Sequence, residues 1–314
     1  MTMLNKILDI KYPIIQGAMA NIATAEFAAS VSNAGGLGII ATGAMTCSQA
    51  RDEIRKCKKL TDKPFGVNVM MMNPETDDIM NMICEEKVCV VTTGAGNPGK
   101  YVEMLKKAGT KVFPITPSVA LAKRLERAGV DGIIAEGGES GGHVGEQTTM
   151  SLVPQVVDAV SIPVIAAGGI ADARGFNAAL ALGAVGVQVG TCLLATEECP
   201  IHENYKKAVL KAKDTDTIVT GKSLGAPVRV LKNRMSRQYV KIESEAGSRE
   251  ELEKLTLGGL RRAVFDGDTV TGSVMMGQVA GMVNEVRTIE EVLIDIVENS
   301  KKELEILIDK HKEL

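Results

Sequence analysis

The sequence has few aromatic residues and lacks the long apolar runs of a membrane protein. Aromatic residues make up 3% of the 314 residues, and tryptophan is absent, so platforms for stacking single-stranded nucleic acid are not expected. The formal net charge of −3 gives no general attraction to nucleic acid or to an anionic membrane. Because no run of eighteen apolar residues occurs and charges interrupt the apolar N-terminus, we expect neither a membrane span nor a signal peptide.

Metal-binding and disulfide patterns are also missing. The six cysteines form no CxxC pair and have no zinc-finger spacing to a histidine. Neither HExxH nor a cluster of Asp and His is present, so we expect no dedicated metal site. Reduced thiols are the simplest interpretation of such cysteines, and they favour a cytoplasmic protein.

A regular alternation of short apolar runs and longer amphipathic stretches fills the chain from residue 12 to about residue 213. The eight runs, rich in Val and Ile, are residues 12–19, 37–42, 65–70, 88–96, 111–118, 131–138, 163–170 and 186–191. They are almost continuously hydrophobic, as strands buried on both faces should be. Eight strand–helix units predict an α/β fold with a closed (β/α)8 TIM barrel, and an open doubly wound sheet is the alternative.

The alternation stops after residue 213. We therefore expect the barrel to occupy residues 1–213 and a smaller C-terminal lid domain to occupy residues 214–285. Within the lid, the small-residue stretch GSVMMGQVAGMV at residues 272–283 predicts a buried helix. Residues 286–314 are charged and amphipathic, which predicts a C-terminal helix that packs back on the barrel.

In a TIM barrel the functional site lies at the C-terminal ends of the strands. Gly168, Gly169 and Gly190 follow the seventh and eighth predicted strands, where bare backbone N–H groups can approach an anion. We therefore predict a ligand that bears a phosphate, although tight turns alone also use glycine. Asn68 and Glu136 each close an apolar strand, and either a ligand or neighbouring backbone groups must satisfy them.

The stretch GGESGGHVGEQ, residues 137–147, follows the sixth predicted strand and holds one of the three histidines. Its glycines allow the loop to approach a flat ligand. They also leave His143 as the one group there that exchanges a proton near pH 7. The pattern indicates a general acid or base, or a donor to a developing oxyanion, and a histidine bonded to loop backbone is the alternative.

With these residues in place, the chain resembles the flavin-dependent enoyl-[acyl carrier protein] reductase II family, within the wider nitronate monooxygenase (2-nitropropane dioxygenase-like) group. The matching motifs are YPIIQGAMA (12–20), SNAGGLGII (32–40), TDKPFGVNVM (61–70), VVTTGAGNP (90–98), AEGGESGGHVGEQTTM (135–150), IPVIAAGGIAD (162–172), VQVGT (187–191) and GSVMMGQVAG (272–281). The resemblance covers nearly the full length. It implies a barrel that holds FMN, with a smaller domain closing over it.

The resemblance also implies roles for individual residues. It places Ala18 and Met19 against the flavin ring, Asn68, Glu136 and Gly141 along the cofactor, Gly168, Gly169, Gly190 and Thr191 at its phosphate with Gln188 nearby, and His143 as the active-site histidine. The implied reaction is reduction of trans-2-enoyl-[acyl carrier protein] to the acyl form, the last step of the fatty acid elongation cycle. NADH or NADPH would supply the hydride through FMN. Relatives of the family can respond to a monovalent cation, which is a further candidate cofactor.

A basic stretch between residues 217 and 241 contains no acidic residue. Acyl carrier proteins are acidic, so the stretch fits a docking surface made of Lys222, Arg229, Lys232, Arg234 and Arg237. The phosphates of a nicotinamide cofactor, or simply solvent, are the other partners that such charges can have. We expect a homodimer, with no nucleic-acid or membrane partner.

Four positions depart from the family pattern. Ala18 replaces a glycine, and where the family's active site or lid should be, Asn21 replaces an aromatic residue, Cys192 replaces an arginine, and Ala226 replaces a histidine. They leave two alternatives open: a nitronate monooxygenase that uses O2, and another FMN-dependent NAD(P)H oxidoreductase. Flavin-free alternatives are a barrel of the inosine-monophosphate dehydrogenase type, with Cys192 as nucleophile, and a non-enzymatic phosphate-binding barrel.

Overall fold

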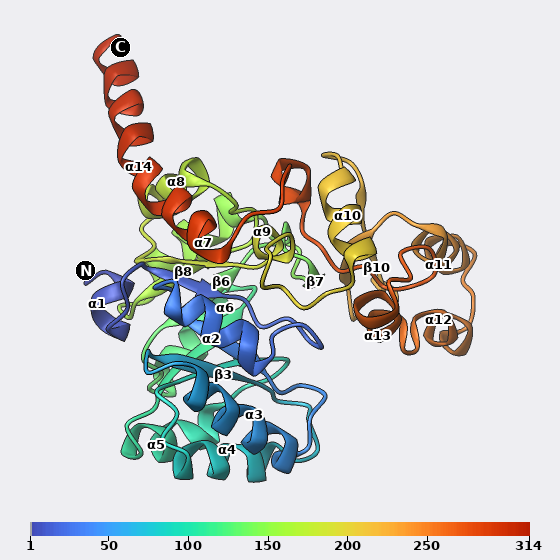
Figure 1. Cartoon of the computed structure of the whole chain (residues 1–314), viewed down its shortest axis with the longest axis horizontal. Helices are drawn as coiled ribbons and strands as arrows, with labels where there is room; N and C mark the ends of the chain where they lie inside the picture. The colour runs from blue at the N-terminus through green and yellow to red at the C-terminus, as the bar shows by residue number, and fades with distance from the viewer. Residues whose placement is uncertain (1) are drawn as a thin grey trace.

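The computed structural model describes residues 2–314, and its central element is a closed barrel of parallel strands (Figure 1). The eight strands are β1 (Ile14–Gln16), β2 (Gly38–Ala41), β3 (Phe65–Met70), β4 (Val90–Gly94), β5 (Lys111–Thr116), β6 (Ile133–Glu136), β8 (Val164–Ala167) and β9 (Val187–Val189). Their order is β1-β9-β8-β6-β5-β4-β3-β2. A parallel bridge between Ile15 and Leu37 joins the two ends, so the sheet closes on itself. Each predicted apolar run contains one of these strands, which confirms the TIM barrel and excludes the open sheet.

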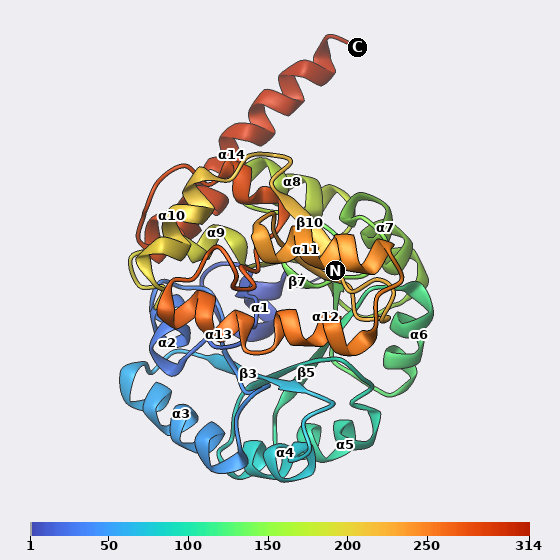
Figure 2. The same ribbon diagram turned by 90° about the vertical axis from the view of Figure 1, so that its right-hand side faces the viewer.

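A ring of helices covers the outside of the barrel, as Figure 2 shows. The helices are α2 (Ala25–Asn33), α3 (Cys47–Leu60), α4 (Thr76–Glu85), α5 (Gly99–Lys107), α6 (Val119–Arg127), α7 (Thr149–Ala159), α8 (Ala173–Ala181), α9 (Thr191–Leu194) and α10 (Glu203–Lys211). Side-chain caps fix where several of them begin. Thr46 forms a capping box with Gln49 at the start of α3, and Asp172 accepts from two backbone N–H groups at the start of α8.

The lower half of the barrel interior is filled by apolar side chains and closed by a short helix. Ile15, Ile39 and Ile134 are fully buried in one cluster with Leu4 and Leu8 of α1 (Leu4–Leu8). Burial of each such side chain contributes about 1.5–3 kcal/mol. Figure 1 shows α1 and the C-terminal lid on opposite sides of the barrel, so only the end beneath the lid stays open.

The lid consists of a hairpin and several short helices. Its elements are β10 (Thr217–Thr220), β11 (Val228–Leu231), α11 (Arg234–Ser244), α12 (Arg249–Thr256), α13 (Gly259–Arg261) and the π-helix η1 (Arg262–Asp266). The predicted helix at residues 272–283 is wrong: the chain is extended there and forms only the 3-10 helix η2 (Gln278–Met282). Gly277 explains this, because a Cβ on it would lie 2.7 Å from the carbonyl oxygen of Glu139. The segment packs backbone against backbone, which a helix would prevent.

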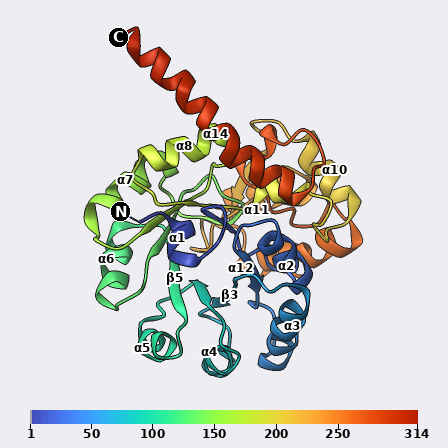
Figure 3. The ribbon, with the colours of Figure 1, turned by 60° about the vertical axis from the view of Figure 1, so that its left-hand side comes forward.

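The last helix, α14 (Ile289–Lys312), has two different halves. Ile289, Leu293 and Ile296 are fully buried near α8 and α2, whereas Leu304 and Leu307 are 47% and 44% exposed. Figures 1 and 3 show the outer half projecting away from the body of the protein. The division of the chain at residues 213 and 285 stays a prediction. Within residues 2–314, none of the helices combines the length and the apolar composition needed to cross a bilayer.

Candidate active site

A cavity of about 610 Å³ opens at the C-terminal ends of the barrel strands, beneath the lid. All eleven residues singled out from the sequence line it: Ala18, Met19, Asn68, Glu136, Gly141, His143, Gly168, Gly169, Gln188, Gly190 and Thr191. They follow five different strands, so the closed barrel brings them together. The volume lies within the range of about 300–1,000 Å³ that cofactor and ligand sites occupy. That these residues bind a cofactor stays a prediction.

The side of the cavity beyond β8 and β9 is formed by glycine backbone. Gly168 and Gly169 have φ values of +90° and +71°, which favour glycine. A Cβ added to Gly190 would meet only the sulfur of Met19, at 3.7 Å, so the space in front of this residue is open. Within residues 2–314, the amide N–H groups of Gly169 and Gly190 donate to no protein acceptor. Free donors beside open space are what an anionic group such as a phosphate requires.

Two amide side chains provide further unused polar groups. Gln188 is 6% exposed and makes no side-chain hydrogen bond within the described chain, although it lines the cavity. Asn68 donates from Nδ2 to Thr92 Oγ1 at 3.0 Å, which leaves its carbonyl oxygen available. Both amides line the cavity, so they can donate to and accept from a ligand bound there.

Glu136 closes β6 at the base of the cavity. Removal from water raises its pKa to about 7, and the hydroxyl of Ser140 partly opposes this shift. Glu139 is the other carboxyl group in the lining, and its oxygens accept from Thr149 N at 3.0 Å at the start of α7. Among the described residues, no Lys or Arg lines the cavity. An anion bound there must therefore rely on backbone N–H groups.

His143 lies at the mouth, on the two-residue strand β7 (Gly142–His143). This strand pairs with β11 of the lid, and Gly142 adopts a φ of +79°. The side chain of His143 is exposed and makes no hydrogen bond to the described part of the chain. The histidine is thus not tied to loop backbone, and its imidazole remains free to meet a ligand.

Several neighbours of His143 were not predicted from the sequence. Leu260, Met275 and Val279 line the cavity from the lid side, and Arg229 contacts the base of the histidine loop. Met275 and Val279 belong to the matching motif GSVMMGQVAG and Arg229 to the basic stretch, but the sequence does not place them near His143, because they lie about 90 to 140 positions further along the chain. Only the strand pairing between β7 and β11 brings them near.

Three of the four departures from the family pattern, Asn21, Cys192 and Ala226, lie outside the cavity lining, whereas Ala18 is part of it. Cys192 is 4% exposed, and burial raises the pKa of its thiol to about 12. A thiol in that state is a poor nucleophile, which argues against a barrel of the inosine-monophosphate dehydrogenase type.

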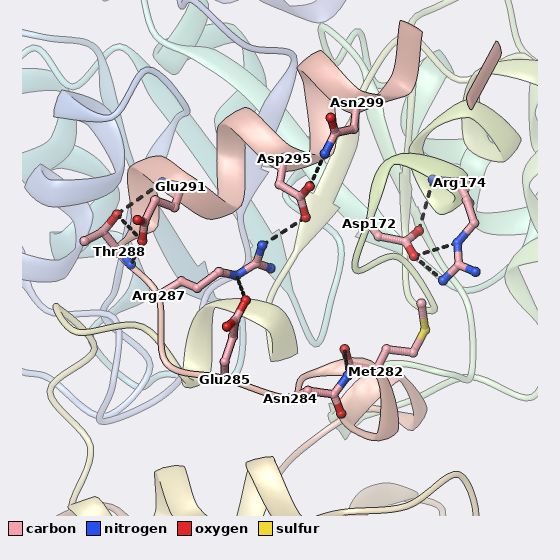
Figure 4. A network of polar contacts seen from close by, with 10 residues as sticks. All are labelled: Asp172, Arg174, Met282, Asn284, Glu285, Arg287, Thr288, Glu291, Asp295 and Asn299. Atoms are coloured by element: carbon pink, nitrogen blue, oxygen red, sulfur yellow. Dashed lines mark hydrogen bonds and ion pairs between the residues drawn. The ribbon is translucent and has the colours of Figure 1, made fainter. Parts of the chain in front are cut away.

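Polar contacts lie beside the first half of α14 and the start of α8 (Figure 4). Arg287 donates to Asp295 of α14 at 3.0 Å, and Arg174 pairs with Asp172 at the start of α8. Each of these contacts is local to one helix. Asn177 Nδ2 of α8 donates to the carbonyl oxygen of Ser300 in α14 at 2.7 Å, and this hydrogen bond joins the two helices.

The closed barrel, the glycines after its last two strands and the histidine at its mouth together define a TIM-barrel enzyme. The chain belongs to the nitronate monooxygenase family, whose family model matches residues 1–86 and 77–299. The protein is therefore an oxidoreductase of that family.

Three similar proteins show the range of the family. FabK from Thermotoga maritima, an enoyl-[acyl carrier protein] reductase II, is 48% identical, with 98% of each chain covered and a TM-score of 0.95. A probable nitronate monooxygenase from Staphylococcus aureus is 36% identical over 88% of this chain and 90% of its own. A 5-hydroxy-7a-methyl-1-oxo-octahydro-1H-indene-4-carboxyl-CoA dehydrogenase from Rhodococcus jostii is 32% identical over 98% and 97% of the two chains.

Proposed function

We propose that this protein reduces the double bond of a trans-2-enoyl thioester carried by acyl carrier protein, with NADH or NADPH as reductant and FMN as cofactor. The observation that carries the proposal is the 48% identity to FabK over 98% of the chain, in a fold that gathers all eleven expected residues around one cavity. The Rhodococcus jostii relative, named for a CoA thioester, adds support for a thioester substrate.

The lining residues fit FMN. Gly169 and Gly190 offer free N–H donors for its phosphate, and the amide of Gln188 and the carbonyl oxygen of Asn68 remain available for the polar edge of its ring. When bound, FMN supplies hydride transfer between the nicotinamide and the β-carbon of the thioester. The protein's own contribution is to orient these partners and to exclude water.

His143 manages the proton in this proposal. Addition of hydride at the β-carbon pushes an electron pair onto the thioester carbonyl, and the α-carbon then takes up a proton. An imidazole at the cavity mouth can donate to that carbonyl oxygen and deliver the proton. His143 is the one histidine in the lining, and its ring has no competing partner within residues 2–314.

The lid fits an acidic carrier protein. Lys222, Arg234 and Arg237 are exposed on the hairpin turn and on α11, and Lys232 is half-buried between them. Arg229 was also assigned to this docking surface, but its guanidinium takes part in an internal contact. Docking therefore depends on the other four basic residues.

An anaerobic experiment tests the proposal. The purified holoprotein is reduced with NADH or NADPH, crotonyl thioester is added, and flavin absorbance is followed. Rapid return of the oxidised spectrum is the expected result. Flavin that stays reduced until air or another acceptor is admitted would instead indicate a different FMN-dependent oxidoreductase.

Nitronate monooxygenase activity is the second candidate, favoured by the Staphylococcus aureus relative. In that reaction His143 would take the proton next to a nitro group, and O2 would reoxidise the flavin. Flavin that neither nicotinamide reduces, but that turns over with a nitroalkane in air, would establish this candidate.

A further inference from the structure

The strand that carries His143 is paired only with the lid. His143 lies opposite Val228 of β11, and Gly142 lies opposite Arg229. Because β11 also pairs with β10, the histidine occupies an edge of a three-stranded sheet whose other two strands belong to the lid hairpin. Nothing in the barrel sheet pairs with β7. The lid hairpin therefore fixes the backbone from which the imidazole extends.

Arg229 makes a second attachment between the same two segments. Its Nε and Nη2 donate to the carbonyl oxygen of Gly138 at 3.0 and 2.8 Å. Its Nη1 donates to Thr217 Oγ1 of β10 at 3.1 Å. One guanidinium thus joins the base of the histidine loop to both strands of the hairpin. Such a planar fork of donors is a property of arginine that lysine does not share.

Arg229 differs from the other basic residues of the lid in its surroundings. It is half-buried, and burial lowers the pKa of its guanidinium, although the carboxylate of Glu139 opposes that shift. Arg237 on α11, in contrast, is exposed and makes no ion pair in the described chain. Removing the guanidinium charge of Arg229 from water costs free energy, and its three hydrogen bonds offset that cost.

The rest of the loop has little freedom to move independently. A Cβ on Gly141 would lie 2.7 Å from the backbone of Met276, so the loop packs directly on the segment after η1. Gln278 N donates to the carbonyl oxygen of Glu139 at 2.9 Å. Since the ring of His143 has no hydrogen bond within residues 2–314, its place depends on how the backbone of the loop is attached.

We propose that Arg229 is a positioning residue for His143, acting by anchoring residues 138–143 to the lid hairpin. Arg229 does not line the cavity, so it acts on the reaction only through the loop. The expected loss of reaction rate rests on the proposed enoyl reduction, whereas the expected change in the position of His143 does not. The lid hairpin, which is continuous with the basic docking surface, then also holds His143 in place.

The kinetic test compares Arg229→Gln and Arg229→Lys with Arg127→Gln as matched control, since Arg127 of α6 is exposed and makes no ion pair in the described chain. The acceptor is a crotonyl N-acetylcysteamine thioester, which has neither phosphate nor carrier protein, so charge-dependent docking does not contribute. For Arg229→Gln, the maximal rate of flavin reoxidation should fall by about 10- to 100-fold, and KM should change less than about threefold. Arg229→Lys keeps the charge but loses the fork and should be intermediate, whereas Arg127→Gln should match the parent.

Histidine NMR provides the structural test on the same holoproteins. The chain has three histidines, His143, His202 and His311, so histidine-selective labelling gives three ring signals, and His143→Gln assigns one of them. The His143 signal should shift or broaden in Arg229→Gln while the other two stay in place. If Arg229→Gln gives no holoprotein, Arg229→Lys serves the same comparison.

Two outcomes separate this inference from the proposed function. An unchanged His143 signal together with an unchanged reoxidation rate in both Arg229 variants would overturn the positioning role. Failure of the parent protein to pass electrons to the thioester would instead overturn enoyl reduction. In that case the histidine signal alone still decides whether Arg229 positions the loop.

Discussion

The two sides of the cavity are built in different ways. The side beyond β8 and β9 consists of residues 168–170 and 188–191, where main-chain N–H groups face open space. The side around His143 is assembled from the loop after β6 and lid segments about 90 to 140 residues further along the chain. We predict an anion site on the first side, whereas the second side carries the imidazole of His143. Binding and chemistry can therefore be disturbed separately.

His143→Ala should produce the largest loss of reaction rate, and it should affect only the histidine side of the cavity. Flavin content should stay at the parent level, because the glycine side is untouched. Reoxidation of reduced flavin by crotonyl thioester should slow by about 10²- to 10⁴-fold, the usual contribution of a general acid or base. Stopped-flow absorbance measures the rate, with His311→Ala on the exposed end of α14 as control. Unchanged turnover would remove the role assigned to His143.

Glu136→Gln should alter the pH dependence of stability. The pKa of Glu136 is about 7 in the folded protein, above its ordinary value of 4.5. A raised folded pKa means that the folded state holds the proton more tightly, so stability falls as pH rises from about 4.5 to 7 and levels off above. Glu136→Gln should abolish this fall and raise the unfolding free energy of the apoprotein at pH 8 by up to about 3 kcal/mol.

Urea unfolding of the apoprotein at pH 5 and pH 8 measures this effect. Glu146→Gln, at an exposed position of the same loop, is the matched control and should leave the pH dependence as it is. An equal pH dependence in parent and Glu136→Gln would show that the carboxyl group is solvated through the cavity.

Gly190→Ala should weaken the glycine side while leaving the histidine side intact. The new methyl group would enter the open space assigned to the phosphate, and loss of one or two N–H contacts should reduce FMN affinity by about 10- to 100-fold. The apoprotein should keep its stability, since only Met19 lies within 4 Å of that methyl group. Gly168→Ala is the contrast: its Cβ would lie 2.8 Å from the carbonyl oxygen of Gly137, so it should destabilise the apoprotein as well. Fluorescence titration with FMN and thermal unfolding distinguish the two.

The smallest effect is expected far from both sides. Removal of residues 301–314 deletes the projecting half of α14, whose side chains are exposed, and should change the unfolding free energy by less than about 1 kcal/mol. Leu293→Ala, in the buried half of the same helix, should cost about 2–5 kcal/mol. Equal losses in the two variants would show that the outer half has a partner in solution.

The sequence predicted what depends on local pattern. Continuous apolar runs located every barrel strand, and glycines at the ends of two of them located the open space near Gly190, where an anion site stays a prediction. It failed where distant backbone segments meet. The stretch at residues 272–283 has the composition of a small-residue helix, but Gly277 serves a close approach to Glu139, and the chain stays extended. Likewise, Arg229 looked like one more surface charge, because only the pairing of β7 with β11 places it beside Gly138.

The apolar cluster that fills the α1 end of the barrel has a consequence for how two substrates reach the cavity. Leu4 and Leu8 of α1 fill that end together with the isoleucines of the strands, whereas residues of the lid line the cavity at the other end. A nicotinamide donor and a thioester acceptor that both enter from the lid side would have to bind one after the other. Initial rates at several fixed concentrations of the second reactant should then give parallel double-reciprocal lines, the pattern of ping-pong kinetics.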